Sequence, residues 1–455
     1  MGKLADNENK DKFNLIYIFF IVFGVASLSA WNSIISAADY FSKRLPTPHA
    51  MNLLLIIYNV GVLPSMIITN VFHAAISLLA FTRASFIAFT LLMICVPFVC
   101  SYLANTWTAM VLMMLIAFVC GIFVGFMNVT LFGLGGMFAG KQSIAILIGQ
   151  GFCGLLCLIP LILHCAIPGD NTNTVGLIFF IFSACINLVA TIMTFIFPHL
   201  PFVKYTFRIN KEAKDQFTQQ MIEVPTDGTT GAVDSADSES ALDKSESSVE
   251  TKPVEQQDQQ PNEPTNQNQV PTSKCEAIKQ FLKEMVRVGK MVKWWALALM
   301  ISMFSTLLFY PSAYLAIPAP KYFSTAWQLT LWTHLRLTIF NICDVVSRFV
   351  AMCCFFYKTS RVAMIVSLLR IVWSVLFFVA NWIPAFQLLP VYVILFVVFA
   401  LVHGYHMSVM MGVAADAEKV PLKDRSAVGS FLSISLNIGL ALGCILALPL
   451  GYSYQ

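Results

Sequence analysis

Long apolar stretches follow one another along most of this chain, and polar residues gather mainly in the segments between them. A helix needs about 20 residues to cross a hydrocarbon core roughly 30 Å thick. Stretches of that length predict an all-α polytopic membrane protein with eleven transmembrane helices. The predicted spans are residues 14–38, 50–72, 84–104, 107–132, 142–168, 174–200, 293–318, 325–355, 360–382, 388–415 and 424–450.

Composition supports a membrane protein and narrows its chemistry. Of the 455 residues, 58% are hydrophobic and 11% are charged, whereas about a quarter of a soluble protein is charged. The first apolar stretch is too long, and is followed too closely by others, to be a cleaved signal peptide. The 12 Cys lie mostly within predicted spans without paired metal spacing, so we expect apolar packing, no metal and no cofactor.

Basic residues in alternate short loops indicate the orientation of the chain. Loops rich in Lys and Arg face the cytoplasm, so the better populated side is predicted to be cytoplasmic. With an odd number of spans, the N-terminus is then cytoplasmic and the C-terminus extracellular in a multi-pass cell membrane protein. One side carries Lys3, Lys10, Lys12, Arg83, Lys141, Lys358, Arg361, Lys419, Lys423 and Arg425, and the other carries Lys43, Arg44 and Lys321.

A long polar segment divides the predicted spans into six and five. Between Asp215 and Ser273 it is rich in Ser, Asp, Glu, Gln, Asn and Pro, a composition that favours disorder. We predict a six-helix bundle over residues 1–200, a cytoplasmic, largely disordered loop over 201–292, and a five-helix bundle over 293–455. Two such bundles would form pseudo-repeats that hold a substrate between them near the midplane. The basic ends of the loop are typical of cytoplasmic flanks, with anionic lipid binding as the alternative.

The eighth predicted span carries a polar stripe in the sequence FNICDVVSR. Asn341, Asp344 and Arg348 are three and four residues apart, so they share one face of a helix. Buried charges are costly unless they are paired, and inside a membrane they usually mark a substrate or ion pathway. We therefore expect a transport site here, with a pair that staples two helices as the alternative.

Two other predicted spans carry candidate ligand groups. Trp31 in span one offers a π-face for stacking a planar ring, although a Trp near a span end is also typical of the membrane interface. Gln150 in span five lies between Gly149 and Gly151, and it must find either a ligand or a partner on another helix.

Charged residues near the other span ends are expected to meet water. Asp416, Glu418, Lys419, Asp424 and Arg425 fit a short cytoplasmic loop, either as solvated charges or as gate salt bridges. Arg336 and Arg370 fall within predicted spans, and we expect both to reach the interface by snorkelling.

Together these motifs resemble the equilibrative nucleoside transporter family over nearly all of the chain except the central loop. The resemblance implies eleven spans, a fold similar to the major facilitator architecture, a cytoplasmic N-terminus, alternating access and nucleoside substrates. The span-eight pattern FNxxDxxGR is its most specific element. The matching residues are Trp31-Asn32, Tyr40-Phe41, Gly149-Gln150, Gly154, Phe340-Asn341, Asp344, Arg348 and Gly404-Tyr405.

The resemblance also implies roles for individual residues. Trp31 would line the base side of a cavity, with Leu28 and Ile35 as apolar wall, and Gln150 would hydrogen-bond the base. Asp344 and Arg348 would engage the ribose hydroxyls with Asn341 in support. The chain departs from the family where Ser29-Ala30 replace Leu-Pro, where Ser347 replaces Gly, and where Val402-His403 replace Ser-Asn.

The leading hypothesis is a facilitative carrier of nucleosides, or of nucleosides and nucleobases. The alternatives are proton-coupled uptake through Asp39, Asp344, His403 or His406, and a polytopic lipid-modifying enzyme. The enzyme has less support because His164, His199 and His406 lack a nucleophile–base spacing or a metal-ligand cluster. The expected partners are the substrate and the lipid bilayer, with no nucleic acid polymer and no obligatory protein partner.

Overall fold

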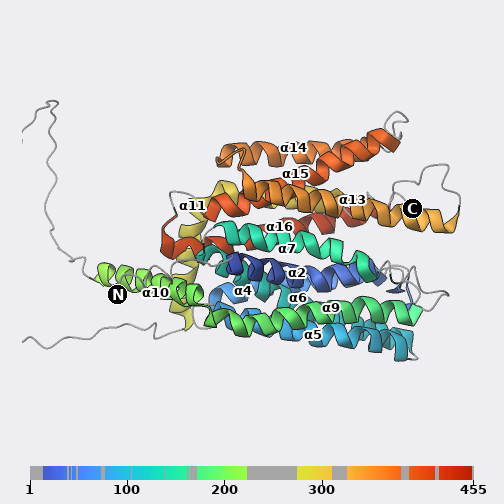
Figure 1. Ribbon diagram of the computed structural model, residues 1–455, viewed down its shortest axis with the longest axis horizontal. Helices are drawn as coiled ribbons and strands as arrows, with labels where there is room; N and C mark the ends of the chain where they lie inside the picture. Colours follow the sequence, from blue (N-terminus) through green and yellow to red (C-terminus); the bar gives the residue numbers. More distant parts are fainter. Residues whose placement is uncertain are drawn as a thin grey trace, which may run out of the picture.

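The structure is a computed structural model whose described residues form an all-helical bundle (Figure 1). Its long helices are α2 (Leu15–Ser36), α4 (Ala50–Phe72), α5 (Leu78–Tyr102), α6 (Thr106–Met137), α7 (Gly140–Leu156), α9 (Thr172–Ile196), α10 (Pro201–Ile222), α11 (Lys274–Phe309), α13 (Ala326–Cys353), α14 (Ser360–Ala380), α15 (Leu389–Ala415) and α16 (Arg425–Tyr452). Two 3-10 turns, η2 (Phe197–His199) and η4 (Leu422–Asp424), precede α10 and α16. The description covers residues 14–452 except 38–39, 42–43, 48–49, 73–76, 104, 139, 161–162, 164–171, 223–273, 310–324, 381–388 and 416–419.

The outer surface of the bundle is apolar, as a bilayer requires. Large aliphatic side chains point outward along the helices, among them Val111 on α6, Ile192 on α9 and Leu369 on α14. Within the described residues, 9 stretches are long and apolar enough to cross a membrane, and they lie in α2, α4, α5, α6, α7, α9, α11, α15 and α16. The all-α polytopic fold is confirmed. The count of eleven, which needs α13 and α14 as well, remains a prediction.

Close helix contacts depend on glycine, because only a missing side chain lets two backbones approach this far. A Cβ on Gly24 of α2 would overlap the carbonyl of Ile146 on α7, and a Cβ on Gly149 of α7 would overlap the carbonyl of Ile21 on α2. The same holds between α6 and α16, where a Cβ on Gly429 would overlap the carbonyl of Phe132. Small residues therefore hold α2 against α7 and α6 against α16.

Helix α7 lies between α2 and two helices from the second half of the chain. It packs on α2 on one side and on α13 and α15 on the other. In Figure 1, α13, α14 and α15 lie above α7, while α5 and α9 lie below α2. The other helix pairs in extensive contact are α4 with α6, α5 with α6 and α9, α11 with α14 and α16, α6 with α16, and α13 with α15. Polar side chains on α7, α13 and α15 are therefore brought together from distant parts of the sequence.

The central segment contains more helix than its composition predicted at both ends. Helix α10 continues to Ile222, and α11 begins at Lys274. Val292 has non-helical dihedrals, φ −116° and ψ 15°, so α11 bends where its basic first part meets its apolar second part. Helix α10 extends from one end of the bundle (Figure 1). Residues 223–273, the middle of the predicted disordered loop, lie outside the described part of the chain.

Candidate functional site

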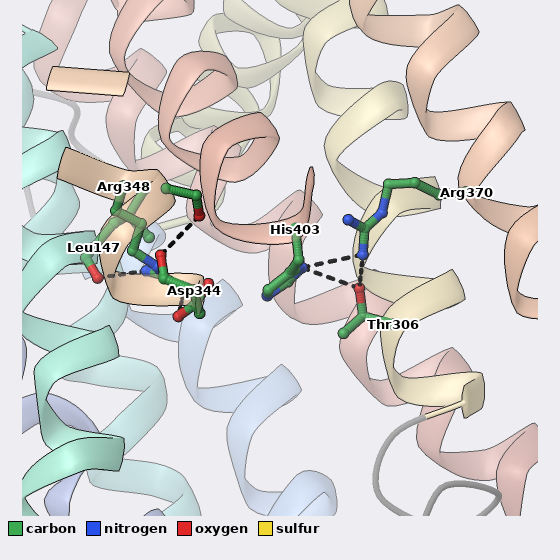
Figure 2. Close-up of polar contacts among 7 residues, drawn as sticks. Leu147, Thr306, Asp344, Arg348, Arg370 and His403 are labelled. Atoms are coloured by element: carbon green, nitrogen blue, oxygen red, sulfur yellow. Dashed lines mark hydrogen bonds and ion pairs between the residues drawn. The ribbon is translucent and has the colours of Figure 1, made fainter. Parts of the chain in front are cut away.

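The polar stripe of α13 is a buried ion pair. Arg348 Nη2 lies 2.9 Å from Asp344 Oδ2, and the two side chains are 8% and 6% exposed. Arg348 Nη1 also donates to the carbonyl oxygen of Leu147 on α7. The guanidinium therefore joins its own helix to α7, as the stapling alternative predicted, while the ligand site at the same residues stays a prediction (Figure 2).

Glycines of α7 make room for this stripe. A Cβ on Gly151 would lie 3.1 Å from Asp344 Oδ2, and a Cβ on Gly154 would lie 2.6 Å from the amide of Asn341. Asn341 therefore lies directly over Gly154. The spacing in the sequence predicted a shared face for Asn341, Asp344 and Arg348, and the structure confirms that all three are turned toward α7.

Helix α15 closes the opposite side of the Asp344 carboxylate. A Cβ on Gly404 would lie 2.6 Å from Asp344 Oδ1 and would overlap both the Asp344 carbonyl and Ser347 Oγ. Ser347 itself donates to the Asp344 carbonyl at 2.9 Å. The Ser347 hydroxyl is therefore bonded within α13 and lies against Gly404 of α15.

The ion pair does not use all of its hydrogen-bonding capacity. Within the described structure, Asp344 Oδ1 and Arg348 Nε are buried without a hydrogen-bond partner. A buried polar atom without a partner costs about 1–3 kcal/mol. A ligand that supplies a donor to Oδ1 or an acceptor to Nε would recover that cost.

Gln150 joins α7 to α2. Its Nε2 lies 3.2 Å from Ser27 Oγ, and Ser27 in turn donates to the Gly24 carbonyl at 2.7 Å. The interhelical hydrogen bond expected as the alternative for Gln150 is therefore present. Gln150 is next in the sequence to Gly151, which packs on Asp344, but its own side chain is turned toward Ser27 on α2.

Trp31 lies in a more apolar environment than the ion pair. Its ring centroid is 4.5 Å from that of Tyr58 on α4, with the rings inclined by 37°. Both rings line a small apolar cavity. Leu28 and Ile35, one turn before and after Trp31, are half-buried on the same helix. The structure brings the α13 stripe and the Gln150 segment together, whereas Trp31 lies against α4.

A second buried cluster was missed by the sequence analysis, which expected Arg370 to reach the interface. That expectation is wrong: Arg370 is 3% exposed and its Nη2 lies 2.6 Å from Thr306 Oγ1 on α11 and 3.1 Å from His403 Nδ1 on α15. Its guanidinium also lies 4.8 Å from the centroid of the Phe399 ring. Figure 2 shows this cluster beside the ion pair. The side chain of Arg336 is outside the described set.

His406, one turn along α15 from His403, has a separate set of partners. Its Nδ1 contacts the phenol of Tyr357, whose pKa is raised by burial, so the phenol stays protonated. His406 Nε2 lies 2.8 Å from Ser367 Oγ. Ser367 donates its own proton to the Ala298 carbonyl at 2.8 Å, so this serine is not activated as a nucleophile.

A second charge pair joins η4 to α11. Arg287 Nη1 and Nη2 lie 2.8 and 2.7 Å from the two oxygens of Asp424. Asp424 is buried at 2% exposure, so the expectation of a solvated charge is wrong for this residue and a salt bridge is present instead. The sequence did not single out Arg287 as its partner, because 137 residues separate the two. Asp416, Glu418 and Lys419 lie outside the described residues.

Metal ligands do not gather in the described part of the chain, where no group of three or more His, Cys, Asp and Glu is placed to hold an ion.

Comparisons with known proteins give the family. A family model described as Nucleoside transporter matches residues 113–450. Equilibrative nucleoside transporter 1 of Rattus norvegicus is 21% identical over 486 residues, covering 97% of this chain and 98% of the relative. The protein of the same name from Homo sapiens is 22% identical over 482 residues, with the same coverage.

Solved structures give the fold. The chain is similar to the proton:xylose symporter XylE of the major facilitator superfamily, with a TM-score of 0.57, 13% identity, and 96% and 91% of the two chains covered. The E. coli fucose:proton symporter FucP has a TM-score of 0.56 and 11% identity at the same coverage. At these identities the likeness concerns the fold alone, and it confirms the expected major facilitator architecture. Because the family model matches well over half of its residues, the chain belongs to the nucleoside transporter family.

Proposed function

We propose that this protein carries nucleosides across a membrane by facilitative alternating access. The observation that carries the proposal is the Asp344–Arg348 pair, which is buried where α7, α13 and α15 meet and has an unused acceptor and an unused donor. Ribose hydroxyls offer both a donor and an acceptor. A nucleoside can therefore satisfy Asp344 Oδ1 and Arg348 Nε at the same time.

We assign the remaining predicted residues to the two ends of the nucleoside. Asn341 would support the ribose contacts, because its amide lies on the same α13 face. Gln150 would bond the edge of the base, exchanging its contact with Ser27 for a ligand atom. Trp31 would cover the face of the base, with Leu28 and Ile35 as apolar wall. This last contact requires α2 and α4 to separate at the Trp31–Tyr58 contact.

The proposed orientation has a cytoplasmic N-terminus, a cytoplasmic segment between α9 and α11, and an extracellular C-terminus. Its support is the excess of Lys and Arg in alternate loops, together with the packing of the basic helix α10 on η4. The proposal includes eleven spans in two bundles, residues 1–200 and 293–455, with the cytoplasmic segment 201–292 between them. Epitope tags at residue 1, residue 245 and residue 455 should be accessible inside, inside and outside. Termini on the same side would overturn the span count.

The transport function is tested with the purified protein in proteoliposomes. Labelled adenosine, uridine and hypoxanthine are presented with and without a pH gradient, and protein-free liposomes give the background. We expect nucleoside uptake that stops at equal concentrations inside and outside and does not respond to the gradient. Accumulation driven by an inward proton gradient would favour the proton-coupled alternative, and hypoxanthine uptake would extend the substrates to nucleobases.

A further inference from the structure

The second buried cluster consists of Arg370, Thr306 and His403, and none of the roles assigned above uses it. The three side chains come from α14, α11 and α15 and are 3%, 2% and 6% exposed. Burying such polar and charged groups inside a membrane protein is costly, so their presence calls for a functional or structural explanation.

Hydrogen-bond donors and acceptors in the cluster determine the protonation state of His403. A guanidinium donates and never accepts, so Arg370 Nη2 can direct its two hydrogens to Thr306 Oγ1 and to His403 Nδ1. Thr306 donates its own hydrogen to the Ser302 carbonyl at 2.8 Å. His403 Nδ1 must therefore accept, and the ring is the neutral tautomer that carries its proton on Nε2.

The opposite edge of the His403 ring is turned toward the ion pair. Figure 2 shows the imidazole between Arg370 on one side and Asp344 on the other. The next residue along α15, Gly404, is the one that packs on Asp344. Phe340 on α13 flanks the ring, with centroids 5.8 Å apart. The Nε2–H group therefore lies on the side of the proposed ribose contacts.

We propose that His403 is a further substrate-positioning residue, which donates its Nε2–H to a ribose hydroxyl oxygen, and that Arg370 is a positioning residue whose hydrogen bond to Nδ1 keeps the ring hydrogen on Nε2. The proposal rests on the nucleoside transport function proposed above. It also means that His403 does not pick up a proton during the transport cycle.

The charges around the His403 ring agree with a neutral side chain. Arg370 and Arg348 face it from α14 and α13, with Asp344 as the carboxylate between them and His406 on its own helix. Among the described residues, α11 presents the hydroxyl of Thr306. Helices α7 and α16 also pack on α15, and the charges that they carry, Lys141 and Arg425, lie in their first turns. A third cation beside two guanidinium groups would be opposed by both.

The first test compares two replacements of His403. In His403→Gln the amide nitrogen stands near the place of Nε2, whereas in His403→Asn it reaches only the place of Nδ1. Loss of one neutral hydrogen bond costs about 0.5–1.5 kcal/mol, so His403→Asn should raise the KM for uridine roughly 2- to 13-fold. The KM should rise less in His403→Gln. Measured with 2′-, 3′- and 5′-deoxyuridine, the difference should vanish for the analogue that lacks the accepting oxygen. Equal losses in both variants and for all analogues would overturn the positioning role.

The second test isolates the effect of Arg370. The uptake rate of the wild type divided by the uptake rate of His403→Gln should stay constant from pH 5.5 to 8. In Arg370→Met, His403 Nδ1 loses the group that donates to it, so Nδ1 can carry the hydrogen itself and donate to Thr306 Oγ1 at 3.2 Å. Nε2 then has no hydrogen to donate, and the KM for uridine should rise. In the His403→Gln background, adding Arg370→Met should cause no such rise.

Ser374→Ala is the matched control, because it removes another hydrogen bond between α14 and α11, from Ser374 Oγ to the Ser305 carbonyl at 3.0 Å, and should leave the KM for uridine unchanged. An unchanged KM in Arg370→Met, or a wild-type pH dependence that His403→Gln removes, would overturn the inference. If Arg370→Met does not reach the membrane, the wild-type ratio decides alone. Wild-type vesicles without nucleoside uptake would instead overturn the transport function.

Discussion

Two Arg–Asp pairs in this protein have the same chemistry and different construction. Asp344 and Arg348 are neighbours on one helix, are almost completely buried, and leave Asp344 Oδ1 and Arg348 Nε unbonded. Arg287 and Asp424 come from α11 and η4, and both carboxylate oxygens are taken up by the guanidinium. The Arg287 side chain is 46% exposed, so water still reaches it.

The difference indicates which pair serves a ligand. A bidentate pair between two elements fixes their positions and leaves little capacity on the carboxylate for a third partner. A pair within one helix adds little to tertiary packing by itself, and its unused atoms cost free energy until a ligand bonds them. We therefore regard Asp344–Arg348 as a binding pair and Arg287–Asp424 as a structural pair. The predictions at the two pairs test this distinction, and the prediction at Gln150 tests the proposed contact with the base.

The largest effect is expected at the buried pair. Asp344→Ala and Arg348→Ala should each reduce nucleoside uptake to background at retained surface expression, because each leaves one charge unpaired in a low dielectric and removes a ribose contact. Uptake per surface molecule is the measurement. The Asp344→Ala/Arg348→Ala double variant separates two explanations. If the pair only staples α13 to α7, the double variant should recover activity relative to either single variant. Recovery of uptake would contradict the binding role.

An intermediate effect is expected at Gln150. Gln150→Leu should weaken nucleoside affinity roughly 3- to 100-fold, because about 0.5–3 kcal/mol is lost when a hydrogen bond is removed and a polar atom is left buried. Ser27→Ala is the matched control, since it removes the partner of Gln150 on α2 and leaves the amide in place. If the two variants lose affinity equally, Gln150 acts as a helix-packing residue. A larger loss in Gln150→Leu, absent for an analogue without the matching base atoms, would support contact with the base.

The smallest effect on uptake is expected at the structural pair. Asp424→Asn should leave the KM unchanged and lower thermal stability. The loss should be about 1–2 kcal/mol, below the range for fully buried pairs, because half of Arg287 stays in water. Arg208→Ala is the control: its ion pair with Glu212 spans 3.9 Å with both side chains more than half exposed, and such pairs contribute little. A changed KM in Asp424→Asn would break the distinction between the two pairs.

Hydrophobic pattern alone determined the class of this protein, because repeated apolar stretches long enough to cross a hydrocarbon core are typical of membrane-spanning helices. It also placed Asn341, Asp344 and Arg348 on one face, since helical periodicity is local and needs no tertiary information. The resemblance of those motifs to nucleoside transporters was sufficient to predict the family and the major facilitator fold. Both were confirmed by comparison with known proteins.

Only the tertiary structure decided the partners of the remaining charges. Arg370 looked like a snorkelling residue because one Arg in an apolar run gives no sign of its neighbours, and Thr306 and His403 lie 64 and 33 residues away in the sequence. Asp424 looked like a loop charge, yet its partner is on a helix that begins before the seventh predicted span. The stripe of α13 likewise required Gly151 and Gly404 from two other helices to enclose it. Local periodicity fixes the face of a helix, whereas the identity of the group opposite that face depends on how distant segments pack.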